Sequence, residues 1–186
     1  MAFSILKSLF PERAPSYVRF RDNLGNFDIF YPRGWKYDEN IAVVDGKYTV
    51  SFQAPGGRSQ FTISVDTKLP EKFSLKNYMK EEFESPSSGI YAPGVKTRFR
   101  SLPAFKREFS YVSGKAYFGF GLIFRSSREV FTINWTAPES GREQMEKIFS
   151  HMLESLVIKE GPGIERKLFG GGSFEFSPPA EENAGR

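Results

Sequence analysis

The strongest evidence for the fold class is in residues 104–136, AFKREFSYVSGKAYFGFGLIFRSSREVFTINWT. It contains three runs rich in aromatic and β-branched residues, Ala104–Val112, Lys115–Arg125 and Arg128–Thr136, which serine-containing turns separate. Such residues favour strands, and consecutive strands joined by short turns pair antiparallel. The stretch therefore predicts three neighbouring antiparallel strands.

The middle run carries apolar side chains on both of its faces. One face holds Phe118, Phe120, Leu122 and Phe124. The other face holds Tyr117 and Ile123, with Gly119 and Gly121 between them. A strand that is apolar on both sides is expected at the centre of a sheet, and its glycines leave room for a helix, a bulge or a ligand.

Six further runs with strand character precede this stretch. They are Tyr17–Arg21, Phe27–Tyr31, Ile41–Val44, Tyr48–Ala54, Gln60–Asp66 and Val95–Leu102. Asp45-Gly46 is typical of a two-residue hairpin turn, whose central residues need positive φ. We therefore expect most of these strands to pair with their neighbours in the sequence.

Two segments have apolar residues at helical spacing. Ser74–Glu84 begins with a serine that can cap it, and Ser140–Leu156 begins with Ser140 and Glu143 in a capping-box pattern. The apolar stripe of the second segment consists of Met145, Ile148, Phe149, Met152, Leu153 and Leu156. Two groups of strands, each followed by one helix, predict an α+β fold with a central twisted antiparallel sheet flanked by helices.

This pattern predicts one domain over residues 17–159, with an N-terminal extension over 1–16. Glycine and proline interrupt residues 160–186, which are expected to form a flexible tail. No run approaches the roughly 18 apolar residues of a membrane span, and residues 1–10 lack the features of a secretory signal. We therefore expect a cytoplasmic protein, and peripheral membrane association through the short apolar segment 1–10 is the alternative.

The composition argues against most catalytic chemistry. The chain has 20 Phe, one His and no Cys, so it lacks thiolates and is poor in the groups that transfer protons near neutral pH. The single histidine, His151, falls opposite the apolar stripe of the last helix. We expect no metal, no cofactor and no enzymatic activity. The net charge of +4 is too small and dispersed to predict nucleic-acid binding.

Strand alternation sorts the side chains near the centre of the sheet onto two faces. Large apolar residues occupy one face, which should pack against the last helix. The other face carries the small polar residues Thr49, Ser51, Thr62, Ser64, Asp66 and Asn134. Two interpretations fit this face: an ordinary solvated surface and a shallow ligand-binding platform.

A group of basic residues is expected on two neighbouring strands. Lys96, Arg98 and Arg100 alternate with uncharged residues, which predicts that they share one strand face. Lys106 and Arg107 follow on the next strand. In one interpretation these cations keep an edge strand from aggregating, and in the other they form a docking patch for an acidic partner or a phosphate.

Several motifs resemble the PsbP-like family. They are FDIFYPRGW at 27–35, FSLKNY at 73–78, LPAFKREFSY at 102–111 and WTAP at 135–138, followed by the last helix. The resemblance covers about residues 27–158. It implies the α/β/α sandwich shared by the photosystem II extrinsic protein PsbP and a eukaryotic Ran-binding import factor, and it implies binding rather than catalysis.

From these observations we expect a non-catalytic binding or adaptor protein with a protein partner. Two alternatives stay open. The first is a peripheral subunit or assembly factor of a membrane complex. The second is an enzyme that uses the polar sheet face, for which an acid–base pair such as Asp66 beside an arginine in a deep pocket would be required.

Overall fold

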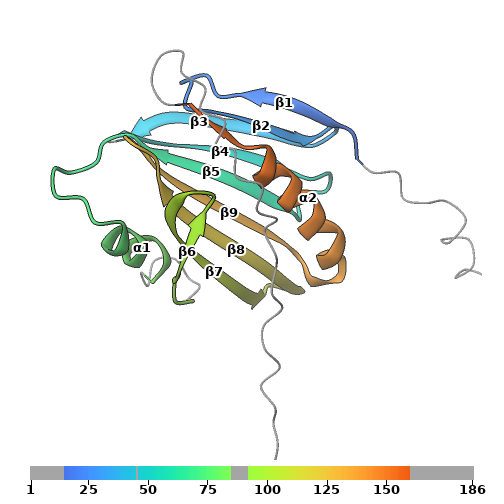
Figure 1. Cartoon of the computed structure of the whole chain (residues 1–186). Coiled ribbons are helices and arrows are strands. Elements are labelled where there is room, and N and C mark those ends of the chain that lie inside the picture. Colours follow the sequence, from blue (N-terminus) through green and yellow to red (C-terminus); the bar gives the residue numbers. More distant parts are fainter. Residues whose placement is uncertain (1–14, 45, 85–91, 160–186) are drawn as a thin grey trace, which may run out of the picture.

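A seven-stranded antiparallel sheet forms the centre of the protein (Figure 1). The structure is a computed structural model that describes residues 15–44, 46–84 and 92–159. The sheet has the strand order β3-β4-β5-β9-β8-β7-β6. Its strands are β3 (Lys36–Val44), β4 (Lys47–Gln53), β5 (Gln60–Asp66), β6 (Val95–Phe99), β7 (Leu102–Val112), β8 (Ala116–Arg125) and β9 (Val130–Pro138). The predicted α+β class is confirmed, and β8 lies inside the sheet as its two apolar faces indicated.

The first hairpin does not join the central sheet. Strands β1 (Tyr17–Arg21) and β2 (Phe27–Pro32) pair with the short β10 (Val157–Ile158) in a second sheet of the order β1-β2-β10. Asp22 builds the hairpin turn, because its carboxylate accepts hydrogen bonds from the backbone N–H groups of Leu24 and Asn26. Residues 1–14 of the predicted extension and the predicted tail 160–186 lie outside the described residues.

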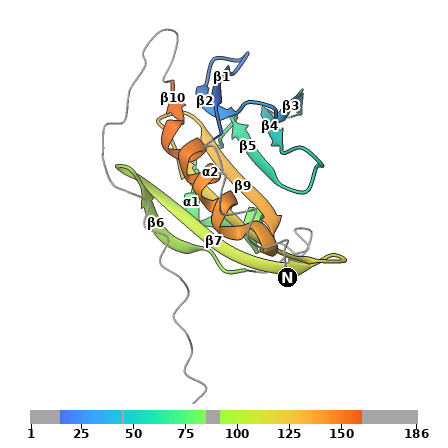
Figure 2. The same cartoon turned by 90° about the vertical axis from the view of Figure 1, so that its right-hand side faces the viewer.

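Two helices cover opposite faces of the central sheet (Figures 1 and 2). Helix α2 (Arg142–Ser155) buries Ile148, Phe149, Met152 and Leu153 in the main core, together with the apolar face of β4, β5, β8 and β9. Helix α1 (Leu75–Phe83) packs Met79 and Phe83 against Ile123 and Val130 on the other face. The resulting α/β/α arrangement is the one that the resemblance implied.

The main core is built around stacked aromatic rings. The ring of Trp135 lies 4.2 Å from that of Phe120, 5.3 Å from that of Phe149 and 5.9 Å from that of Phe61, all at small interplanar angles. These residues come from β9, β8, α2 and β5. The predicted contact between the apolar strand face and the stripe of the last helix is therefore confirmed.

Local predictions were wrong at the end of β6 and at the start of α2. The predicted strand Val95–Leu102 ends at Phe99, because Arg100 adopts a positive φ of 55° and turns the chain directly into β7. Nothing in the sequence signals this turn, since positive φ is uncommon outside glycine and asparagine. The capping box at Ser140 is also absent: a 3-10 turn, Glu139–Gly141, precedes α2, whose N-cap is Gly141 without a side-chain hydrogen bond.

A buried carboxylate ties the second sheet together. The side chain of Asp28 on β2 is 3% exposed and forms ion pairs with Arg19 on β1 and, at 2.7 Å, with Lys159 beyond β10. Burial raises its pKa, but the hydrogen bonds and charges of Lys159 and Arg19 outweigh burial, so the net pKa of Asp28 is lowered. A lowered folded-state pKa stabilises the fold above the unfolded value and loses that contribution as the pH falls through the folded value.

We expect Asp28→Asn to reduce the free energy of unfolding by about 1–2 kcal/mol at pH 7, since a charged hydrogen-bonded pair is removed while the cations regain water. The difference from the wild type should shrink as the pH is lowered below about 4, the ordinary carboxyl pKa. Urea denaturation at pH 7, 5 and 3 measures this. Asp38→Asn, which removes an exposed carboxylate from β3, is the control, and a loss for Asp28→Asn that is independent of pH would contradict the assignment.

Candidate functional site

The face of the central sheet on the α1 side is polar across several strands. The register of β4, β5 and β9 places six predicted residues on this face: Thr49, Ser51, Thr62, Ser64, Asp66 and Asn134. Thr62 lies between Ser51 and Asn134, and Ser64 lies opposite Thr49. The face runs from an end that α1 covers to an open end beyond the helix.

At the covered end, α1 closes the face around Asp66. Lys47 on β4 forms an ion pair with Glu82 of the helix. Burial raises the pKa of the Tyr78 hydroxyl strongly, and the nearby carboxylates of Glu82 and Asp66 add to the shift. Asp66 accepts a hydrogen bond from the backbone N–H of Lys68 at 3.1 Å. This end of the face is therefore used to attach the helix.

The two glycines of β8 make room for two phenylalanine rings. A Cβ on Gly121 would lie 2.9 Å from Cζ of Phe83, the last residue of α1, and 2.9 Å from Oδ1 of Asn134. A Cβ on Gly119 would lie 2.3 Å from the ring of Phe109. The sequence left open a helix, a bulge or a ligand at these glycines. A helix side chain, Phe83, occupies the place beside Gly121, and the ring of Phe109 from the neighbouring strand β7, which was not among the expected alternatives, occupies the place beside Gly119.

Arg107 lies between these two rings. It is 8% exposed, and its guanidinium carbon is 4.3 Å from the ring centre of Phe83 and 5.0 Å from that of Phe109. Its Nη1 donates a hydrogen bond of 2.9 Å to the backbone oxygen of Phe83 at the end of α1. A buried cation in this position holds the helix terminus and satisfies one of its last carbonyl groups.

The other predicted cations do not gather around Arg107. Arg100 lies in the β6–β7 turn and donates to the backbone oxygen of Glu154 at 2.8 Å. Lys106 lies opposite Leu122, on the α2 side of the sheet, and contacts Glu108 at 3.4 Å. Of the five cations, Lys96 and Arg98 lie exposed on β6. The five residues are thus distributed over both faces and a turn rather than joined in one surface.

The open part of the polar face consists of neutral hydroxyl groups. Thr49 Oγ1 and Ser64 Oγ are 2.8 Å apart, and Thr62 Oγ1 donates to the backbone oxygen of Asn134 at 3.2 Å. Thr49, Ser51, Thr62 and Ser64 are all half-buried. They offer hydrogen bonds to a ligand without offering charge.

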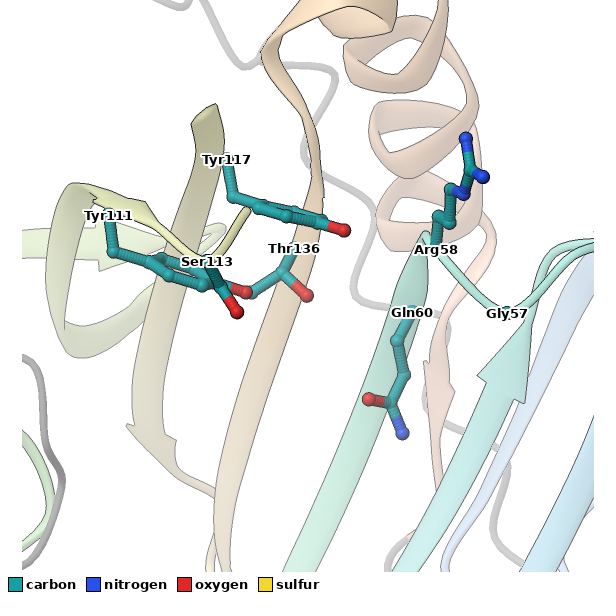
Figure 3. A pocket seen from close by; sticks show the side chains of 7 residues that line it. All are labelled: Gly57, Arg58, Gln60, Tyr111, Ser113, Tyr117 and Thr136. Carbon is teal, nitrogen blue, oxygen red and sulfur yellow. The ribbon is translucent and has the colours of Figure 1, made fainter. Parts of the chain in front are cut away.

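This open face ends in a pocket of about 250 Å³ (Figure 3). The pocket is lined by Gly57, Arg58, Gln60, Tyr111, Ser113, Tyr117 and Thr136. Gln60 on β5 and Thr136 on β9 are direct cross-strand partners. The lining side chains therefore combine hydroxyl groups, one amide and one cation.

Two tyrosines form one wall of the pocket. Tyr111 and Tyr117 are cross-strand partners near the β7–β8 turn, and their rings stack 5.2 Å apart at an angle of 10°. Figure 3 shows the rings one above the other, with Arg58 on the opposite side of the pocket. Phe109 continues the row at 6.4 Å from Tyr111. An aromatic wall therefore runs from Arg107 to the pocket.

The titratable groups considered from the sequence lie elsewhere. Asp66 is six residues from Gln60 along β5, a separation of about 20 Å in a strand. His151 is an exposed residue of α2, on the other side of the sheet, and its ring lies 4.0 Å from that of Tyr17. Among the residues that the structure describes, no three His, Asp or Glu side chains are grouped as metal ligands.

The pocket could not be predicted from the sequence, because the turn between β7 and β8 is one residue longer than the residue pattern indicates. A two-residue turn at Ser113-Gly114 would not bring the two tyrosines opposite each other. In the structure the turn includes Lys115, whose backbone oxygen accepts from Ser113 N–H at 2.9 Å, and Gly114 has a φ of 68°. Ser113-Gly114-Lys115 also fits a three-residue hairpin turn with glycine at positive φ. Interpreting it in this way would have predicted that Tyr111 pairs with Tyr117.

Comparisons with known proteins concern the fold. No protein-family model and no curated protein matches this sequence. The solution structure of cyanobacterial PsbP from Synechocystis sp. PCC 6803 matches with a TM-score of 0.58 and 13% identity, covering 81% of this chain and 96% of that one. A crystal structure from Bacteroides thetaiotaomicron VPI-5482 matches with a TM-score of 0.52 and 17% identity, covering 77% of this chain and 48% of that one. The chain has a PsbP-like fold.

In the described residues, no helix combines the length and apolar character that crossing a bilayer requires.

Proposed function

We propose that this protein is a non-catalytic binding or adaptor protein, and that it holds its ligand on the open polar face of the central sheet. The observation that carries the proposal is the pocket at the end of this face. It presents stacked aromatic rings beside hydroxyl, amide and guanidinium groups, a combination that recognises a polar ligand by shape and hydrogen bonding. A protein partner would insert a side chain or a loop there.

The chemistry of the pocket supports binding over catalysis. Its lining includes neither a carboxylate nor an imidazole, the groups that most often transfer protons in enzymes. Asp66, the acid that an enzyme on this face would use, lies at the covered end beneath α1. Binding also agrees with what the PsbP-like resemblance implies.

Blocking the pocket tests the proposal. In a screen of neutral and charged polar fragments against the ¹⁵N-labelled full chain, most hits should shift the backbone amide signals of Gln60, Tyr117 and Thr136. Thr136→Arg fills the pocket from the strand that forms its floor, so it should weaken these hits at least tenfold, about 1.4 kcal/mol. Dissociation constants from the NMR titrations measure the effect.

Ser110→Arg is the matched control. Ser110 is exposed on β7 and lies opposite Phe118, so its side chain emerges on the α2 side of the sheet. This variant should leave fragment binding unchanged. Hits that instead shift signals of α2 or β1, or that bind Thr136→Arg as well as the wild type, would refute the proposed site.

A further inference from the structure

We propose that the pocket recognises a carboxylate group, with Arg58 as the residue that binds it. This inference rests on the proposed function and names the ligand chemistry of the same site. It starts from the charge of the pocket. Arg58 is the only charged residue in the lining, and it is exposed in the loop between β4 and β5. A pocket with one cation and no acid favours an anionic ligand group.

Arg58 differs from three arginines elsewhere in the protein in having its donors available. Arg107 and Arg100 donate to backbone carbonyl groups, and Arg98 does the same with Ser101 at 2.6 Å. Within residues 15–44, 46–84 and 92–159, no carboxylate forms an ion pair with Arg58. Among the residues that the structure describes, the guanidinium group therefore has no acidic partner that a ligand would have to displace.

The geometry of the donors favours a carboxylate over a phosphate. A guanidinium group is planar and matches the two oxygens of a carboxylate with two parallel hydrogen bonds. Gln60, Ser113 and Thr136 add neutral donors around the pocket. A phosphate carries close to two negative charges at neutral pH, and this lining offers only one positive charge to balance them.

The tyrosine wall accounts for the rest of such a ligand. Tyr111 and Tyr117 stack at 5.2 Å and present ring surface beside the polar groups. Ring faces bury the methylene groups of a ligand while the hydroxyl groups stay available for hydrogen bonds. A carboxylate on a short apolar stem, as in a small organic acid or in the glutamate of a peptide, fits both walls.

Matched acid and amide probes test the inference on the ¹⁵N-labelled full chain. Butyrate is compared with butyramide, and acetyl-Ala-Glu-Ala-amide with acetyl-Ala-Gln-Ala-amide. We expect each acid to shift the backbone amide signals of Gly57, Gln60 and Thr136 and to bind at least tenfold more tightly than its amide. Tighter binding of the glutamate peptide than of butyrate would identify a peptide side chain as the source, and equal binding would identify a small acid.

Arg58→Gln should weaken binding of both acids about tenfold and bring them close to their amides. Arg98→Gln removes an exposed cation from β6, remote from the pocket, and should change neither. Equal affinity for acids and amides, tighter binding of inorganic phosphate than of butyrate, or an unaltered Arg58→Gln variant would overturn the inference. If the neutral fragments still bind at Thr136 in those cases, the proposed function stands; if no probe or fragment shifts these signals, both fail.

Discussion

Replacing Trp135 by alanine is expected to lower the free energy of unfolding by about 4 kcal/mol. The side chain is 1% exposed and joins the central sheet to helix α2, because its ring stacks on Phe120 of β8, Phe61 of β5 and Phe149 of α2. The substitution removes the largest fully buried side chain and leaves a cavity that the surrounding rings can fill only in part. Urea denaturation followed by circular dichroism measures the loss.

Trp35→Ala is the matched comparison. Trp35 is 9% exposed and lies just before β3, where its ring contacts that of Phe149 at 6.1 Å. We expect a smaller loss there, about 2–3 kcal/mol, because the site is at the margin of the core and can relax toward solvent. If Trp135→Ala does not fold, Trp135→Phe keeps most of the stacking and makes the comparison possible. Equal losses at the two tryptophans would contradict the central role of Trp135.

The second large effect is expected for Gly121→Val, with a loss of about 3 kcal/mol. The new side chain would meet the ring of Phe83 and the amide of Asn134. Phe83 is fully buried, so its ring has no open space into which it can move. Its backbone is also held, because Arg107 donates a hydrogen bond to its carbonyl oxygen. The gain in strand propensity, at most about 1 kcal/mol, does not offset this clash. Urea denaturation gives the global loss, and hydrogen exchange of the α1 amides reports release of the helix.

Gly119→Val is the matched comparison, because its new side chain would meet a ring that can move. Its Cβ would lie nearer to a ring atom than that of Gly121 does, at 2.3 Å against 2.9 Å. The ring belongs to Phe109, however, which is half-exposed and can rotate toward solvent. We expect a loss of about 1 kcal/mol or less, within the range of tolerated changes, and unchanged exchange in α1. A greater loss at Gly119 than at Gly121 would show that α1 is not anchored through Phe83.

Arg107 shows that a charge pattern in the sequence does not predict whether each cation is exposed. The sequence predicted a basic patch from three cations at strand spacing and two more on the next strand, yet one of these two, Arg107, is a buried support for α1. Phe105, Arg107 and Phe109 are two residues apart, which predicts that they share one face of a strand. This spacing contains no information on whether a helix covers that face. A helix that returns from a distant part of the chain decides whether a cation on a strand is exposed.

Local residue patterns were enough to predict the elements of this protein and the two faces of its strands. Period-two alternation and turn residues are local properties, so the strand positions, the two helices and the common face of Thr49, Thr62 and Ser64 could be predicted. The tertiary structure alone decided that the first hairpin forms a separate sheet, that Arg107 is buried, and that Tyr111, Thr136 and Arg58 meet in one pocket. These outcomes depend on strand register, where one additional turn residue reassigns every cross-strand partner, and on packing between segments far apart in the chain. The alternating aromatic stretch 104–136 thus contained the strands that line most of the pocket, while the fold brought Arg58 to its rim.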